Sequence, residues 1–154
     1  MRTRAQAIVI RDNAMLFAYG RVMSHRELRH SFIGGAVEDG ESPAQAVLRE
    51  LAEEARVRGE IVFPFSTELH PDHRTFLVDI GGQECRLGHD PEESSLPQDD
   101  RSLMALVWID LAKTHLFTEI DREYIAQLYT ECLQRGHFAD WLPSLRAFLT
   151  QTAS

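Results

Sequence analysis

The chain has 154 residues, a length that fits one domain, and we expect that domain to span residues 1–154. Hydrophobic residues make up 44% of the sequence and charged residues 26%, values that argue against wholesale disorder and against a fibrous repeat. The formal net charge is −8 without a cluster of Lys and Arg, which argues against broad nucleic-acid binding but allows a phosphate ligand brought by a metal ion.

The first elements are predicted from β-branched residues and turn residues. Three consecutive β-branched residues favour a strand over residues 5–10. Asp12–Asn13 offers turn chemistry before a second apolar run at residues 15–19, so the two runs predict a hairpin. The apolar segment 31–38 is expected to be interrupted at Gly34–Gly35, where the backbone takes unusual angles or a ligand approaches it closely.

A helix is predicted to begin at Pro43. Ser42 is suited to cap its amino end, proline is favoured at the first helical position, and Gln45 completes a capping box. Further along the chain, the pattern predicts strands at 58–65, 73–80 and 102–109, a long polar loop at 81–101, and helices at 121–134 and 142–149. This order predicts an α/β fold with a mixed sheet, and the helices at about 121–150 belong to the same domain.

Cys85 and Cys132 are the two cysteines of the chain. Two cysteines form neither a disulfide framework nor a thiolate metal site, and such sparse use favours a reducing compartment, so we expect a cytoplasmic protein. The apolar stretch near the start is too short for a signal peptide, and no later apolar run approaches the ~20 residues of a membrane span. We therefore expect no membrane association.

Three glutamates lie close together on the helix that begins at Pro43. At ~100° per residue, Glu50, Glu53 and Glu54 fall within an arc about 100° wide. A contiguous apolar face is predicted beside this arc, suited to packing on a sheet; it consists of Ala44, Val47, Leu48, Leu51, Ala52 and Ala55. The helix should therefore have a buried side and a carboxylate side.

The excess of acidic residues lies in two segments, one of which contains this helix. Residues 38–60 hold seven acids and three bases, and residues 84–101 hold six acids and two bases, so each segment carries a net charge of −4. Like charges at this helical spacing cost a few tenths of a kcal/mol per exposed pair. A hard divalent cation such as Mg²⁺ offsets this repulsion between the carboxylates, because it takes oxygen ligands from carboxylates and phosphates. An acid-rich helix that only faces solvent is the alternative interpretation.

A longer pattern favours the metal interpretation. After Gly35 come five residues and Glu41, then seven residues and the run Arg49-Glu50-Leu51-Ala52-Glu53-Glu54-Ala55-Arg56-Val57. This pattern resembles the signature of the Nudix hydrolase family at every fixed position except one, where Arg56 replaces glycine. That glycine would end the helix in a left-handed conformation, which is costly for arginine. The helix is therefore expected either to run on or to end differently.

The resemblance implies an α/β/α sandwich with a mixed β-sheet, and hydrolysis of a phosphoanhydride bond in a nucleoside diphosphate linked to another group. It implies Mg²⁺ or Mn²⁺ as the cofactor. By matching positions, the metal ligands would be Glu50, Glu53 and Glu54, with the Gly34 carbonyl as a further ligand, and Arg49 would hold a carboxylate in place. Glu41 lies near enough to supply another oxygen or to hold a water molecule. The resemblance also implies a general base, which is either a motif glutamate or an acid of the long loop.

The loop candidates for the general base are Glu92, Glu93, Asp99 and Asp100, each of which has a solvated loop acid as its alternative interpretation. Arg21, Arg26 and Arg29 precede the glycine pair and are candidates for binding substrate phosphates, although each is more often a surface charge.

The substrate implied by the resemblance is a small nucleotide. Nucleoside triphosphates are slightly favoured because the chain is short; the alternatives are ADP-ribose, another nucleotide sugar or a dinucleoside polyphosphate. A nucleotide-binding regulator with little turnover is the alternative from another functional class. A homodimer formed through the last helix and Trp141 is the alternative to the packing of those residues on their own domain.

Overall fold

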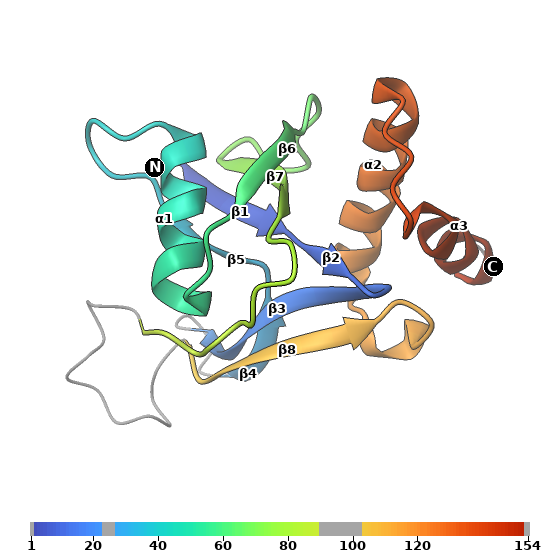
Figure 1. Ribbon diagram of the computed structural model, residues 1–154, viewed down its shortest axis with the longest axis horizontal. Helices are drawn as coiled ribbons and strands as arrows, with labels where there is room; N and C mark the ends of the chain where they lie inside the picture. Colours follow the sequence, from blue (N-terminus) through green and yellow to red (C-terminus); the bar gives the residue numbers. More distant parts are fainter. Residues whose placement is uncertain (1, 23–26, 90–102, 153–154) are drawn as a thin grey trace.

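The computed structural model describes residues 2–22, 27–89 and 103–152, and Figure 1 shows their arrangement. The strands are β1 (Arg4–Ile8), β2 (Ile10–Arg11), β3 (Ala14–Val22), β4 (Glu27–Ser31), β5 (Ile33–Ala36), β6 (Glu60–Pro64), β7 (His73–Asp79) and β8 (Ala105–Asp110). The helices are α1 (Pro43–Ala55), the short 3₁₀ helix η3 (Thr114–Leu116), α2 (Glu119–Arg135) and α3 (Leu142–Gln151).

The strands form two sheets. In the first sheet the order is β5-β1-β7-β6; β1 runs parallel to β7 and antiparallel to β5, and β6 runs antiparallel to β7. This is the mixed sheet that the sequence predicts. In the second sheet β3 is the central strand and pairs antiparallel with β2, β4 and β8.

The strands lie between helices, with α1 on one side and α2 and α3 on the other (Figure 1). Two apolar clusters fill the spaces between these layers. The cluster under α1 includes Ala5, Ala7, Val47, Leu51 and Val78. The cluster under α2 and α3 includes Ile8, Phe17, Ile125, Leu128 and Phe148. The α/β/α arrangement confirms the predicted fold class.

The glycine pair does not interrupt its segment, contrary to the prediction. Gly34 and Gly35 lie inside β5, where they pair with Gln6 and Ala5 of β1. A Cβ added to Gly34 would lie 2.1 Å from the carbonyl oxygen of Ala5, so glycine allows the two strands to approach closely. The pair therefore continues the strand and holds the start of the signature against β1.

Other boundaries also differ from the predicted ones. The predicted strand at 5–10 divides into β1 and β2, and β4 was not predicted because its sequence, ELRHS, lacks the apolar character of a typical strand. The first part of the predicted loop, residues 81–89, forms neither helix nor strand. The remainder of that loop, including Glu92, Glu93, Asp99 and Asp100, lies outside the described residues.

Helix α1 begins as predicted. The Ser42 side chain accepts a hydrogen bond from the Gln45 backbone N–H, and the Gln45 side chain accepts one from the Ser42 N–H. The predicted apolar face is wrong at two positions, because Ala46 is buried and Ala52 is exposed. Ala46 falls on the carboxylate side of the helix, so the start of that side packs against the protein instead of facing solvent.

Helix α2 is held at both ends by its own sequence. Thr118 and Asp121 form a capping box, and the left-handed Gly136 ends the helix by donating its N–H to the carbonyls of Cys132 and Leu133. Asp121 also pairs with His30 of β4 at 2.6 Å, which joins α2 to the second sheet. No helix of the described residues combines the length and the apolarity needed to cross a lipid bilayer.

A buried carboxylate joins α2 to the segment after β6. Glu131 has no exposed surface, and its carboxylate accepts hydrogen bonds from the backbone N–H groups of Ser66 and Thr67 and from the Gln127 side chain. Burial by itself raises the pKa of Glu131, but the hydrogen bonds from Ser66, Gln127 and Thr67 outweigh it, so the pKa lies below its ordinary value of 4.5. The ionised form is thus the form that the fold stabilises.

We expect Glu131→Gln to lower the free energy of unfolding at pH 7 by about 1–2 kcal/mol, because charged hydrogen bonds become neutral ones. Since the folded pKa is depressed, this contribution is fully present above the unfolded pKa of 4.5 and is lost as the pH falls through the folded pKa. Urea unfolding from pH 7 to pH 3 measures the effect, with the exposed Glu123→Gln as the control. A stability difference that does not shrink toward low pH would contradict the prediction.

Candidate active site

Arg49 of α1 donates hydrogen bonds to three carboxylates. Its Nε and Nη2 donate to Oε2 and Oε1 of Glu41 at 2.7 and 3.0 Å, a two-point contact. Its Nη1 donates to Glu50 Oε1 at 3.0 Å and to Glu53 Oε2 at 3.3 Å. Nη2 also donates to the carbonyl oxygen of Ala36 at 3.1 Å, which fixes the arginine to the end of β5. The structure therefore brings together four of the predicted site residues.

The protonation behaviour of these carboxylates differs with their environment. The hydrogen bonds from Arg49 hold the pKa of Glu41 down at about 2, so Glu41 stays ionised over the physiological range. The same contact with Glu41 raises the pKa of Arg49. Burial and the nearby charge of Glu50 raise the pKa of Glu53 despite the contact with Arg49. Negative charge is thus in excess around Glu53, which favours the binding of a further cation.

The lack of a side chain at Gly35 leaves room for the Glu50 carboxylate. A Cβ at this position would lie 2.3 Å from Glu50 Oε1, so any larger residue would displace the carboxylate from β5. The Glu50 side chain is 14% exposed, and it is held between the strand and Arg49. This contact explains physically why the signature begins with a glycine fifteen residues before a glutamate.

The helix ends at Ala55 despite the missing glycine. Arg56 takes the left-handed conformation itself, with φ 55° and ψ 41°. This conformation costs an L-residue with a Cβ roughly 1–2 kcal/mol. Both alternatives, a helix that runs on and a helix that ends differently, are therefore wrong, because Arg56 itself ends the helix in the left-handed conformation. The surrounding structure compensates for the strain of Arg56.

The residues present fit a divalent metal ion by their chemistry. Glu50, Glu53 and Glu54 offer hard oxygen donors, and Arg49 occupies one oxygen of Glu50 and one of Glu53. Within residues 2–22, 27–89 and 103–152, no three His, Cys, Asp or Glu side chains converge on a point where they could hold a metal. Glu54 also lies on α1, in its last turn, and Gly34 lies on the neighbouring β5.

Two of the predicted phosphate-binding arginines, Arg21 and Arg29, lie on the second sheet. Arg29 of β4 pairs with Glu27 at 2.7 Å on an exposed part of the sheet. Arg21 lies on the neighbouring β3, opposite Leu28. Arg26 lies outside the described residues. Their role in substrate binding stays a prediction.

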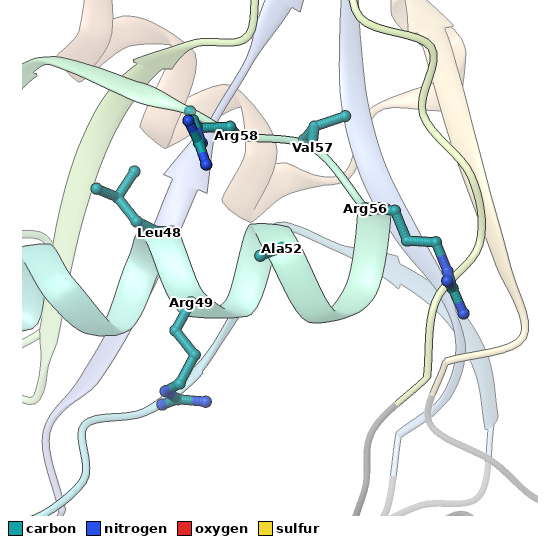
Figure 2. A pocket seen from close by; sticks show the side chains of 7 residues that line it. Leu48, Arg49, Ala52, Arg56, Val57 and Arg58 are labelled. Carbon is teal, nitrogen blue, oxygen red and sulfur yellow. The ribbon is translucent and has the colours of Figure 1, made fainter.

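A groove of about 590 Å³ runs along α1, on the side opposite the carboxylates. Its lining consists of Leu48, Arg49, Ala52, Arg56, Val57, Arg58 and Gly59. Figure 2 shows Arg49 and Leu48 on opposite sides of the helix, with Arg58 on the Leu48 side. Arg49 reaches from the edge of this groove to the carboxylates, so the groove and the carboxylate cluster lie on different faces of α1.

Residues 86–89 belong to the long polar loop predicted at 81–101, and the sequence left open whether that loop approaches the carboxylates. The backbone N–H groups of Arg86, Gly88 and His89 donate hydrogen bonds to the last turn of α1, which carries Glu53 and Glu54. Gly88 in the middle of a polar segment was the available signal, because a conformationally free residue also permits a close approach of two backbones.

Known proteins resemble this chain in sequence and in fold. The model of the NUDIX domain family matches residues 1–128. A solved structure described as a nudix hydrolase family member from Chromobacterium violaceum is 23% identical, with a TM-score of 0.56, over 99% of this chain and 91% of that chain. A MutT NUDIX hydrolase from Burkholderia pseudomallei is 22% identical, with a TM-score of 0.59, over 82% of this chain and 96% of that chain.

A third fold neighbour is a Caenorhabditis elegans Ap4A hydrolase, which is 16% identical with a TM-score of 0.51 over 98% of both chains. No curated protein matches the sequence significantly. The structural likenesses show the fold, and the family model covers most of the chain, including the glycine pair of β5, α1 and the Arg49 cluster. The chain therefore belongs to the Nudix family of hydrolases, enzymes that act on pyrophosphate bonds.

Proposed function

We propose that this chain is a metal-dependent pyrophosphohydrolase that cleaves a phosphoanhydride bond in a nucleoside diphosphate linked to another group, with nucleoside triphosphates as the favoured substrates. The arrangement of Glu41, Glu50 and Glu53 around Arg49 is the observation that carries the proposal. A purely solvated acidic face would not hold its carboxylates in this way, since exposed side chains lose conformational entropy when they are fixed.

Each residue of the cluster has a distinct role in this proposal. Glu50, Glu53 and Glu54, with the Gly34 carbonyl, would hold Mg²⁺ or Mn²⁺. A bound metal of this kind neutralises phosphate charge and lowers the pKa of its water. Arg49 orients the carboxylates of Glu50 and Glu53 by its hydrogen bonds. The general base stays open between a motif glutamate and an acid of the loop that ends at residue 101.

Glu41 has a supporting role. Its two-point contact fixes the guanidinium plane of Arg49, and its low pKa keeps the contact ionised at every pH at which the enzyme would work. The Ser42 cap follows Glu41 directly, so the start of α1 and the anchor of Arg49 are positioned together. The cluster is therefore built on a rigid element.

The test is a substrate panel with purified protein. Fold neighbours are described as an Ap4A hydrolase, a UDP-X diphosphatase and an ADP compounds hydrolase, so the panel contains nucleoside triphosphates, Ap4A, UDP-sugars and ADP-ribose. Release of phosphate, pyrophosphate or nucleoside monophosphate is followed with Mg²⁺ and with a chelator. We expect turnover of at least one nucleotide with Mg²⁺, loss of turnover on chelation, and recovery when Mg²⁺ is returned.

The other outcomes decide between the alternatives. Faster turnover of ADP-ribose, another nucleotide sugar or a dinucleoside polyphosphate would replace nucleoside triphosphates as the substrate class. Nucleotide binding without any turnover would refute the enzyme and favour the regulator. Cytoplasmic location and a homodimer remain predictions of the sequence, which fractionation and light scattering test.

A further inference from the structure

The last turn of α1 is closed by a distant part of the chain. The final carbonyl groups of a helix have no partner within the helix and must find one elsewhere. Backbone N–H groups of residues 86–89 supply three partners: Arg86 N donates to Ala55 O at 3.0 Å, Gly88 N to Glu54 O at 2.8 Å, and His89 N to Glu53 O at 3.1 Å. At the end of α2, by contrast, the N–H of the adjacent Gly136 donates to two of the final carbonyl groups.

Residues 83–89, called the strap below, are also fixed at their other end. The Gln83 amide accepts from the backbone N–H of Arg58 at 2.9 Å and donates to the carbonyls of Arg58 and Ile80, each at 2.7 Å. Arg11 donates to the carbonyl of Gln83 at 2.6 Å. The partly buried Cys85 packs against the apolar cluster under α1. The strap therefore ties the end of α1 to β2 and to the residues that precede β6 and follow β7.

Gly88 is the position where the strap comes closest to the helix. A Cβ there would lie 1.7 Å from the carbonyl oxygen of Glu53, which is backbone and cannot move aside alone. By contrast, a Cβ at Gly82, just before the strap, would have no heavy atom within 4 Å. Glycine at 88 is thus required for the contact, and Gly82 offers a matched control.

We propose that the strap positions the catalytic carboxylates, with Gly88 as the positioning residue. The carbonyls that the strap binds belong to Glu53 and Glu54, so the hydrogen bonds fix the backbone from which both carboxylate side chains extend. The left-handed Arg56 strains this end of the helix, and the strap supplies the contacts that hold it closed. This inference rests on the proposed function, in which Glu53 and Glu54 hold the metal.

The test compares Gly88→Ala with Gly82→Ala. Mg²⁺ affinity is measured by calorimetry without nucleotide, and kcat and KM are measured on the best substrate of the panel. We expect Gly88→Ala to weaken Mg²⁺ binding about fivefold or more, and to lower kcat more than it changes KM, whereas Gly82→Ala should match the wild type. Unfolding curves establish that the variants are folded.

Amide hydrogen exchange gives a readout that does not depend on turnover. Because coupling between two sites is reciprocal, Mg²⁺ should slow exchange at the amides of Arg86, Gly88 and His89 in the wild type. Gln83→Ala loosens the strap at its other end, away from Glu53, and should weaken Mg²⁺ binding in the same direction. It replaces Gly88→Ala in the comparison should the latter variant not fold.

The outcomes separate this inference from the proposed function. Faster exchange of the strap in Gly88→Ala or Gln83→Ala, with Mg²⁺ affinity and kcat at wild-type values, would overturn the positioning role and leave the proposed function intact. A wild-type protein that binds no Mg²⁺ and hydrolyses no nucleotide would refute the proposed function, and the positioning role with it.

Discussion

Glu53→Gln and Glu54→Gln are each expected to lower kcat/KM by about 100-fold or more, which corresponds to about 2.7 kcal/mol of lost transition-state stabilisation. The substitution keeps the size of the side chain but removes a charge and weakens an oxygen ligand for the metal. In Glu53→Gln, Arg49 also loses one of its charged partners. The measurement is steady-state hydrolysis of the best panel substrate over a range of Mg²⁺ concentrations.

The control for both variants is Glu123→Gln, because Glu123 is an exposed acid on α2, across the sheets from α1 (Figure 1). It changes the net charge by the same amount, so any general electrostatic effect on an anionic substrate appears in it as well. Turnover within twofold of the wild type in both Glu53→Gln and Glu54→Gln would show that the carboxylates of α1 do not carry the reaction.

Arg49→Ala is expected to lower kcat about 10-fold to 100-fold, the usual effect of removing a group that orients metal ligands. The variant leaves Glu41, Glu50 and Glu53 without the cation that they share. It also removes the bond to the Ala36 carbonyl that ties the cluster to β5. We expect the pKa of Glu41 to return from about 2 toward 4.5, because its main stabilising contact is lost.

Arg49→Lys separates charge from geometry. Lysine keeps the positive charge, but it cannot make the two-point contact with Glu41 while it also reaches Glu50 and Glu53. We therefore expect Arg49→Lys to recover only part of the activity. Arg146→Ala, at an exposed position of α3, is the control for loss of a surface arginine. Full activity in Arg49→Ala would contradict the orienting role.

The start of α1 illustrates what local sequence can predict. The capping box of Ser42 and Gln45 depends only on residues three positions apart, so it follows from the sequence without knowledge of the fold. The spacing of Glu50 and Glu53 on one side of α1 depends on the helical repeat alone. These local rules correctly predicted where the helix begins, whereas the roles of its carboxylates stay predictions.

Contacts between distant segments could not be predicted in the same way. The burial of Ala46 and the exposure of Ala52 depend on the side from which β5 and β1 meet α1, which a helical wheel does not contain. The placement of Gly34 inside β5 depends on its pairing with β1. Each of these facts involves a partner that lies remote in sequence.

The sequence by itself determined the family signature, the mixed α/β class and the set of acidic residues that α1 presents, because these depend on residue type and short spacing. Only the tertiary structure decided that Gly35 makes room for Glu50, and that Arg49 holds Glu41, Glu50 and Glu53 together. The same is true of the left-handed exit at Arg56, since a strained backbone persists only where distant contacts, here those of residues 86–89, hold it in place.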